Sequence, residues 1–146
     1  MAEIPPLPRH LTLQVVTPDR SVVTEEVDEV QIPGADGYFD VLPGHTPLLA
    51  ALKIGELWYR KGGRRYYLSV IFGFAEVLPD RVTILAQLAE LPDEIDVARA
   101  EAARKRAEQR LAQPTVDLDF ERARVALMKA LIRIQVSTKA KHLAMG

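Results

Sequence analysis

The chain has 146 residues, of which 48% are hydrophobic and 27% charged, a composition typical of globular proteins that excludes general disorder. It contains no cysteine, which excludes a disulfide scaffold, a thiolate zinc site and a cysteine nucleophile. No apolar run approaches the roughly 18 residues that a membrane span needs, and the first ten residues lack an apolar signal core, so we expect a cytosolic chain.

Charge and turn-forming residues divide the chain in two. Residues 1–93 hold 8 Lys/Arg and 13 Asp/Glu, a net charge of −5, whereas residues 94–146 hold 11 and 7, a net charge of +4. Nine of the ten prolines lie before residue 93 and seven of the eight glycines before residue 74. This break predicts two structural units that meet near Pro92. We expect a flexible extension over 1–10, a β-domain over 11–91 and a helical hairpin over 92–146.

Short strands separated by turns are predicted throughout the first unit. Leu11, Leu13 and Val15 alternate with polar residues, which is the period of a half-buried strand. Gly73 interrupts an apolar run and predicts a bulge or a close backbone approach. Many short strands at turn spacing favour a sandwich or a barrel. The other strands are predicted at 27–32, 37–42, 54–60, 64–72, 74–78 and 82–85, with turns at 17–20, 33–34, 43–44, 61–63 and 79–81.

Two helices are predicted in the second unit. Asp93 or Asp96 can cap the first helix, and Pro114 ends it. Apolar residues recur every three or four positions in both helices, which predicts an antiparallel hairpin with a narrow, alanine-rich seam. Such a seam buries little apolar area, so the hairpin either detaches readily or packs permanently on the first unit. The stripe residues are Val97, Ala100, Ala103, Ala107 and Leu111 in the first helix, and Phe120, Ala123, Leu127, Ala130 or Leu131, and Ile134 in the second.

Basic residues are the main chemical feature of the helices. They repeat at spacings of seven and four, so each set shares one helix face. Such a face is either solvated, with ion pairs along the helix, or binds an anion such as a nucleotide, an acidic protein surface or nucleic acid. The acidic remainder of the chain disfavours nucleic acid, and no glycine-rich phosphate loop accompanies the basic residues. The two sets are Arg99, Arg106 and Arg110, and Arg122, Lys129 and Arg133.

Five short motifs stand out in the sequence: V-T-P-D at 16–19, L-P-G-H-T-P-L at 42–48, G-F-A-E-V at 73–77, V-T-I-L-A at 82–86 and I-D-V-A-R-A at 95–100. In this order they resemble the epsilon subunit of F-type proton-translocating ATP synthase, of the bacterial type. The resemblance runs from about Leu11 to Val136. It implies an N-terminal β-sandwich followed by a C-terminal antiparallel two-helix hairpin.

The resemblance also implies a function. In the family, this central-stalk subunit has no catalytic residues of its own, couples proton-driven rotation to ATP synthesis, and inhibits ATP hydrolysis through its helices. Its partners are the gamma subunit, the c-ring and the alpha/beta head; it is peripheral to the cytoplasmic face of the bacterial inner membrane. By position, Tyr38 and His45 are candidates for the c-ring contact, and Arg122, Lys129 and Arg133 for the inhibitory contact with beta. The alternative is a stand-alone sandwich adaptor whose basic hairpin docks on an acidic partner.

Some bacterial members of the family require no cofactor but bind ATP as a regulatory ligand on the folded hairpin. Lys129 stands where strong binders have arginine, and lysine lacks the guanidinium fork. Two further departures lie in the sandwich. Asp40 replaces a usual glycine, so if that glycine has a positive φ the turn must differ locally or carry strain, and Ile71 and Phe72 replace small residues. Carried over by position, the ATP site comprises Glu90, Ile95, Asp96, Arg99, Ala100, Lys129 and Arg133.

Overall fold

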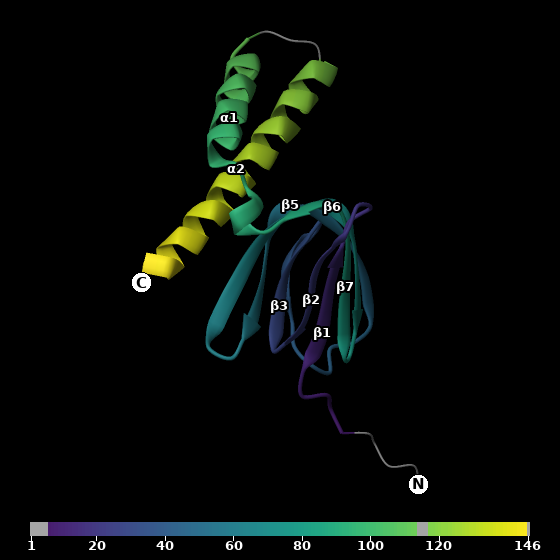
Figure 1. Ribbon diagram of the computed structural model, residues 1–146. Coiled ribbons are helices and arrows are strands. Elements are labelled where there is room, and N and C mark those ends of the chain that lie inside the picture. Colours follow the sequence, from purple (N-terminus) through teal and green to yellow (C-terminus); the bar gives the residue numbers. More distant parts are fainter. Residues whose placement is uncertain (1–5, 114–116, 146) are drawn as a thin grey trace.

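The computed structural model describes residues 6–113 and 117–145; the side chains of residues 117, 118 and 140–145 lie outside that description. A seven-stranded β-domain is followed by a short 3-10 helix and two α-helices (Figure 1), which confirms the predicted fold class. The elements are β1 (Leu11–Val16), β2 (Ser21–Val27), β3 (Glu29–Gly34), β4 (Gly37–Val41), β5 (Leu48–Lys61), β6 (Arg64–Leu78), β7 (Arg81–Glu90), η1 (Pro92–Glu94), α1 (Val97–Leu111) and α2 (Asp117–Met145).

The sheet folds over on itself to form the sandwich. Its strand order is β2-β1-β7-β6-β5-β3-β4, and only β1 and β7 pair in parallel. The long strands β5 and β6 run through both layers. The last residue of β5 therefore lies close to β2, and Lys61 Nζ is 2.9 Å from Glu25 Oε2. The core lies between the layers and includes fully buried residues of both, such as Leu13, Val30 and Ile84.

Strand β6 bends from one layer of the sandwich into the other at Phe72 and Gly73. Gly73 has a φ of 132°, and a Cβ there would lie 2.0 Å from the carbonyl oxygen of Leu85, so only glycine fits. The predicted close approach at Gly73 is confirmed, although the strand continues through it. Phe72 has a φ of 50°, an unfavourable conformation for a bulky residue. Phe72 packs against the cluster of Ile54, Ile71 and Ile132, so the strained residue lies where α2 contacts the sandwich.

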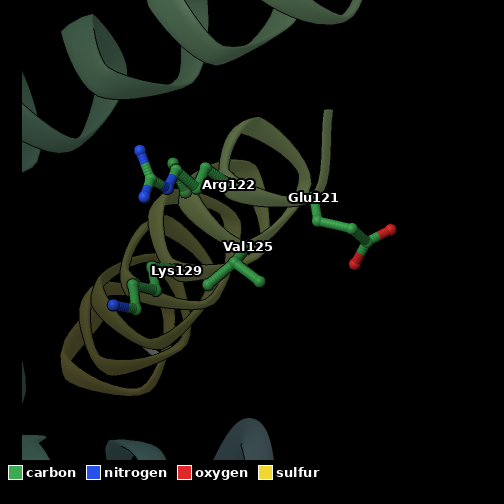
Figure 2. Close-up of a pocket in the computed structure, with 5 residues that line it drawn as sticks. Glu121, Arg122, Val125 and Lys129 are labelled. Carbon is green, nitrogen blue, oxygen red and sulfur yellow. The ribbon is translucent and has the colours of Figure 1, made fainter. Parts of the chain in front are cut away.

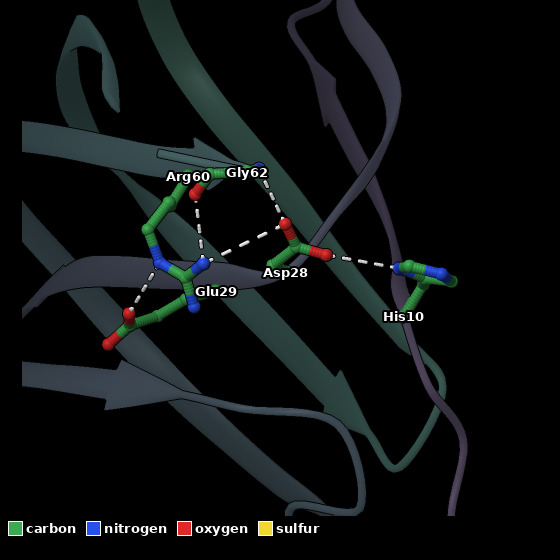
Figure 3. A network of polar contacts seen from close by, with 5 residues as sticks. All are labelled: His10, Asp28, Glu29, Arg60 and Gly62. Carbon is green, nitrogen blue, oxygen red and sulfur yellow. Dashed lines mark hydrogen bonds and ion pairs between the residues drawn. The ribbon is translucent and has the colours of Figure 1, made fainter. Parts of the chain in front are cut away.

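A polar network joins two turns at the end of the sandwich that lies away from the helices (Figure 3). The backbone N–H of Gly62 donates to Asp28 over 2.7 Å, and His10 Nδ1 lies 3.1 Å from the other carboxylate oxygen. Arg60 Nε donates to Glu29 over 3.2 Å. The Gly62 hydrogen bond, followed by that of His10, holds the pKa of Asp28 below its usual value. The network therefore favours ionised Asp28 and ties the β2–β3 turn to the β5–β6 hairpin.

The helices pack antiparallel at the end of the sandwich opposite the start of β1 (Figure 1). Ala100 and Ala107 of α1 and Ala123 and Ala130 of α2 are buried, which confirms the alanine seam. At about 1.5 Å per residue, the 15 residues of α1 span about 22 Å and the 29 of α2 about 43 Å. The second half of α2 therefore extends past α1, and Ile132 packs on the sandwich.

The bounds of several predicted strands are wrong. A single strand was predicted over 27–32, but the chain turns at Asp28, so Val27 ends β2 and Val30 lies in β3. The strand predicted at 54–60 begins six residues earlier, at Leu48. Asp40 lies in β4, paired with Gln31, and its φ is not positive, so the condition for strain at this residue is not met. In the described residues, Phe72 is the one non-glycine residue with positive φ. Of the predicted extension, residues 1–5 lie outside the description.

Replacement of Gly73 by alanine tests the fold in β6. We expect Gly73→Ala to lower the free energy of unfolding by about 3 kcal/mol, because the methyl group meets Leu85 backbone at a φ that alanine disfavours. Chemical denaturation measures the change. Gly63→Ala is the matched control, since nothing lies within 4 Å of a Cβ at that position. Equal effects of the two substitutions would contradict this explanation of Gly73.

Candidate functional site

A cavity of about 340 Å³ lies where α1, α2 and the end of β7 meet. Arg99 and Arg106 reach it from one face of α1, Arg133 from α2 and Glu90 from the end of β7. The small side chains of Ala100 and Ala103 leave the space between them open. Glu94 and Asp96, on the connection between β7 and α1, complete the lining.

The carboxylates around this cavity already have partners. Arg133 Nε donates to Glu90 over 2.6 Å, and Arg20 lies 2.5 Å from Glu94. Arg20 is the main cause of the lowered pKa of Glu94, which also accepts a hydrogen bond from the backbone of Leu91. Glu90 and Glu94 are therefore each paired with a neighbouring arginine.

Asp96 positions the first turn of α1. It is the N-cap residue, and its carboxylate accepts a hydrogen bond from the backbone N–H of Arg99 over 3.0 Å. The predicted cap is thus confirmed at Asp96. Arg99 and Arg106 form no ion pair with a carboxylate of the described residues. These two guanidinium groups leave the cavity able to take an anion such as a phosphate.

Five of the seven residues predicted for the ATP site line this cavity: Glu90, Asp96, Arg99, Ala100 and Arg133. Ile95 is 8% exposed and does not line it. Lys129 lines a different hollow. Glu94 and Arg106 were not predicted for the site, although the seven-residue spacing from Arg99 already placed Arg106 on the same face.

The hollow that contains Lys129 lies on α2 and has a volume of about 380 Å³ (Figure 2). Arg122 and Lys129 project from the same side of the helix, and Glu121 projects from the other. Arg133, predicted both for the inhibitory contact and for the ATP site, faces the first cavity in the folded hairpin and pairs with Glu90. The three basic residues of α2 are therefore divided between two sites.

Tyr38 and His45 lie at opposite ends of the sandwich. Tyr38 follows the β3–β4 turn at the helix end, where its hydroxyl accepts from the backbone N–H of Glu56 over 3.2 Å. His45 follows β4 at the other end, where neighbouring Gly44 donates to the carbonyl of Pro79 over 2.7 Å. A contact made by one end of the sandwich can include one of these residues but not both.

An exposed apolar row crosses the outer face of the sandwich. Ala51, Phe74 and Leu85 pair in register across β5, β6 and β7, so their side chains share one face. Phe74 is 64% exposed and Leu85 54%. Leu49, two residues before Ala51 on the same face, is 75% exposed. Contiguous exposed apolar residues of this kind are typical of protein-binding surfaces.

Comparisons with known proteins identify the family. The model of the ATP synthase delta/epsilon chain β-sandwich domain matches residues 10–92, and that of the delta/epsilon chain long α-helix domain matches residues 93–138. The chain belongs to the ATP synthase delta/epsilon family. The predicted resemblance is thereby confirmed.

Similar members of the delta/epsilon family are bacterial epsilon chains. ATP synthase epsilon chain 2 of Syntrophotalea carbinolica is 51% identical over 130 residues, which cover 88% of this chain and 94% of that one. The epsilon chain of Syntrophobacter fumaroxidans is 51% identical over 88% of this chain and 96% of its own. A chain in the cryo-EM structure of the Euglena gracilis mitochondrial ATP synthase shares the fold, with a TM-score of 0.77, 23% identity and coverage of 94% of this chain and 84% of that one.

The described residues lack two features. They contain no helix long and apolar enough to cross a membrane. Nor do those residues gather three or more histidine, aspartate or glutamate side chains in a metal-binding arrangement.

Proposed function

We propose that this member of the delta/epsilon family is a non-catalytic central-stalk subunit of a proton-translocating ATP synthase. It couples rotation to ATP synthesis, and its C-terminal helices inhibit ATP hydrolysis. The observation that carries the proposal is 51% identity over 94% of the length of an ATP synthase epsilon chain. As such a subunit, it is peripheral to the cytoplasmic face of the bacterial inner membrane, which it reaches only through its partners, and it binds no nucleic acid.

The outer face of the sandwich is the surface we assign to the gamma subunit. The apolar row of Ala51, Phe74 and Leu85, with Leu49 beside it, supplies exposed apolar side chains of the kind that form the centre of lasting protein contacts. One end of the sandwich contacts the c-ring. Because Tyr38 and His45 lie at different ends, cross-linking from Tyr38→Cys or His45→Cys in the assembled complex identifies that end, and cross-links from neither would refute the contact.

The helices supply the inhibitory contact with the alpha/beta head. Arg122 and Lys129 lie on one side of α2 and form no ion pair with the described residues. They are therefore available to an acidic surface of the beta subunit without breaking an existing interaction. Arg133 can join them only after it leaves Glu90, so extension of the hairpin changes the partner of this residue.

ATP is the ligand we assign to the cavity as a regulator rather than a required cofactor. Arg99 and Arg106 are the groups that bind its phosphates, and Arg133 joins them if its pair with Glu90 opens. The cavity is bounded by both helices and the sandwich, so a ligand within it stabilises the folded hairpin.

Inhibition is tested with an ATPase head stripped of this subunit. The full chain slows ATP hydrolysis, and a version ending at Glu90, where β7 ends, binds gamma without slowing it. Phe74→Asp weakens binding of both versions because it places a charge in the apolar row. Leu131→Asp, at a 47% exposed residue of α2, is the matched control for binding of the full chain. If neither version binds or slows the head, the chain is not a stalk subunit and the adaptor alternative is favoured.

ATP binding is tested by calorimetric titration of the full chain. The double variant Arg99→Ala, Arg106→Ala loses at least about tenfold in affinity, because each charge-assisted contact contributes roughly 1.5–3 kcal/mol. Arg110→Ala is the control, since Arg110 lies on α1 outside the cavity. Absence of binding to the full chain, or equal loss in the control, would refute the assignment while leaving the stalk function intact.

A further inference from the structure

The second half of α2 covers a row of three polar residues on the sandwich. Glu56 of β5 lies directly opposite Ser69 of β6, which lies directly opposite Glu90 of β7. Residues directly opposite in antiparallel strands share a face, so the row presents two carboxylates with a serine between them. Arg133 pairs with the carboxylate at one end, as described above.

The other end of the row is more deeply buried. Glu56 is 5% exposed, and Lys139 Nζ lies 2.7 Å from its Oε2. Gln135 donates to Oε1 over 3.4 Å, and the Lys139 ammonium lies 5.2 Å from the centre of the Tyr67 ring. The pair joins residues 83 positions apart, so it links α2 directly to the sandwich.

The two partners depend unequally on each other. The Lys139 side chain is 44% exposed and keeps much of its hydration with or without Glu56. Glu56 is buried under the docked helix, and a buried carboxylate without a partner is strongly unfavourable. Docking of α2 on the sandwich therefore requires that the helix place a cationic side chain beside Glu56.

Ser69 provides an internal comparison. It is 1% exposed, and its hydroxyl has no hydrogen-bond partner among the described residues. It lies in the same row, under the same helix, without a polar contact to α2. Comparison with Ser69 thus separates the effect of charge pairing on α2 docking from the effect of burial beneath the helix.

We infer that Glu56 and Lys139 form a latch that makes docking of α2 on the sandwich conditional on their pairing. In the extended hairpin, Glu56 returns to water and Lys139 is released. The latch sets the ratio of docked to extended hairpin. It rests on the proposed function in one respect: the extended state is the one that reaches the catalytic head.

The latch is tested in the isolated full chain by electron-spin distance measurements. Because the sequence has no cysteine, Asp40→Cys on the sandwich and Thr138→Cys on α2 provide two specific label sites. Lys139→Met lowers the docked-to-extended ratio by roughly tenfold or more, since it leaves Glu56 buried and unpaired. Glu56→Gln lowers it less, because it removes the buried charge together with the pair.

The double variant distinguishes the latch from ordinary packing. Adding Glu56→Gln to Lys139→Met restores docking to the level of Glu56→Gln alone, and Ser69→Ala leaves the ratio unchanged. Circular dichroism confirms that each variant retains its strands and helices. An unchanged ratio in Lys139→Met, or a double variant no better docked than Lys139→Met, overturns the inference. Neither outcome depends on the ATPase head, so failure of the latch is distinguishable from failure of the proposed function.

Discussion

The reversal of the sheet at Phe72 and Gly73 is the constraint on which the rest of the structure depends. Close approach of the Leu85 backbone to Gly73 lets β6 serve both layers, and β5 follows it. The same reversal places Phe72 and Ile71 beside Ile54, where they meet Ile132 of α2. One local backbone conformation thus closes the sandwich and builds the surface on which the helix docks.

The docked helix is held by contacts of two kinds. A small apolar cluster around Ile132 lies beside ion pairs from Arg133 and Lys139 to carboxylates of the sandwich. The seam between α1 and α2 consists largely of alanines and buries little apolar area per residue. Marginal contacts of this type are suited to a segment that exchanges one partner for another, because neither arrangement is much more stable than the other.

Local sequence patterns were sufficient to predict most of the fold. Alternation in residues 11–15, the glycine turn at 62–63 and the alanine periodicity all led to elements that the structure contains. The β2–β3 turn was missed because it contains no glycine or proline; a tertiary hydrogen bond from Gly62 to Asp28 stabilises it instead. Strain at Asp40 was conditional on a positive φ at this position. Among the described non-glycine residues, a positive φ occurs at Phe72.

The candidate site was only partly predictable. Spacing placed Arg99 and Arg106 on one face of α1, but the pair between Arg133 and Glu90 joins residues 43 positions apart, which no local pattern encodes. The docking face of α2 did leave a signal: Val125, Met128, Ile132 and Val136 recur every three or four residues, beside the stripe that faces α1. Glu56 carries no comparable signal, because its partners on α2 lie 79 and 83 positions further along the chain.

Locking the hairpin in its docked state would test most directly whether release of α2 from the sandwich produces inhibition. A disulfide between Ile71→Cys and Ile132→Cys joins two residues of the apolar docking cluster in a chain that has no other cysteine. Added to an ATPase head that lacks this subunit, the oxidised chain is expected to bind without slowing ATP hydrolysis, and reduction of the disulfide is expected to restore inhibition. Equal inhibition by the oxidised and reduced chains would contradict the proposed role of helix release.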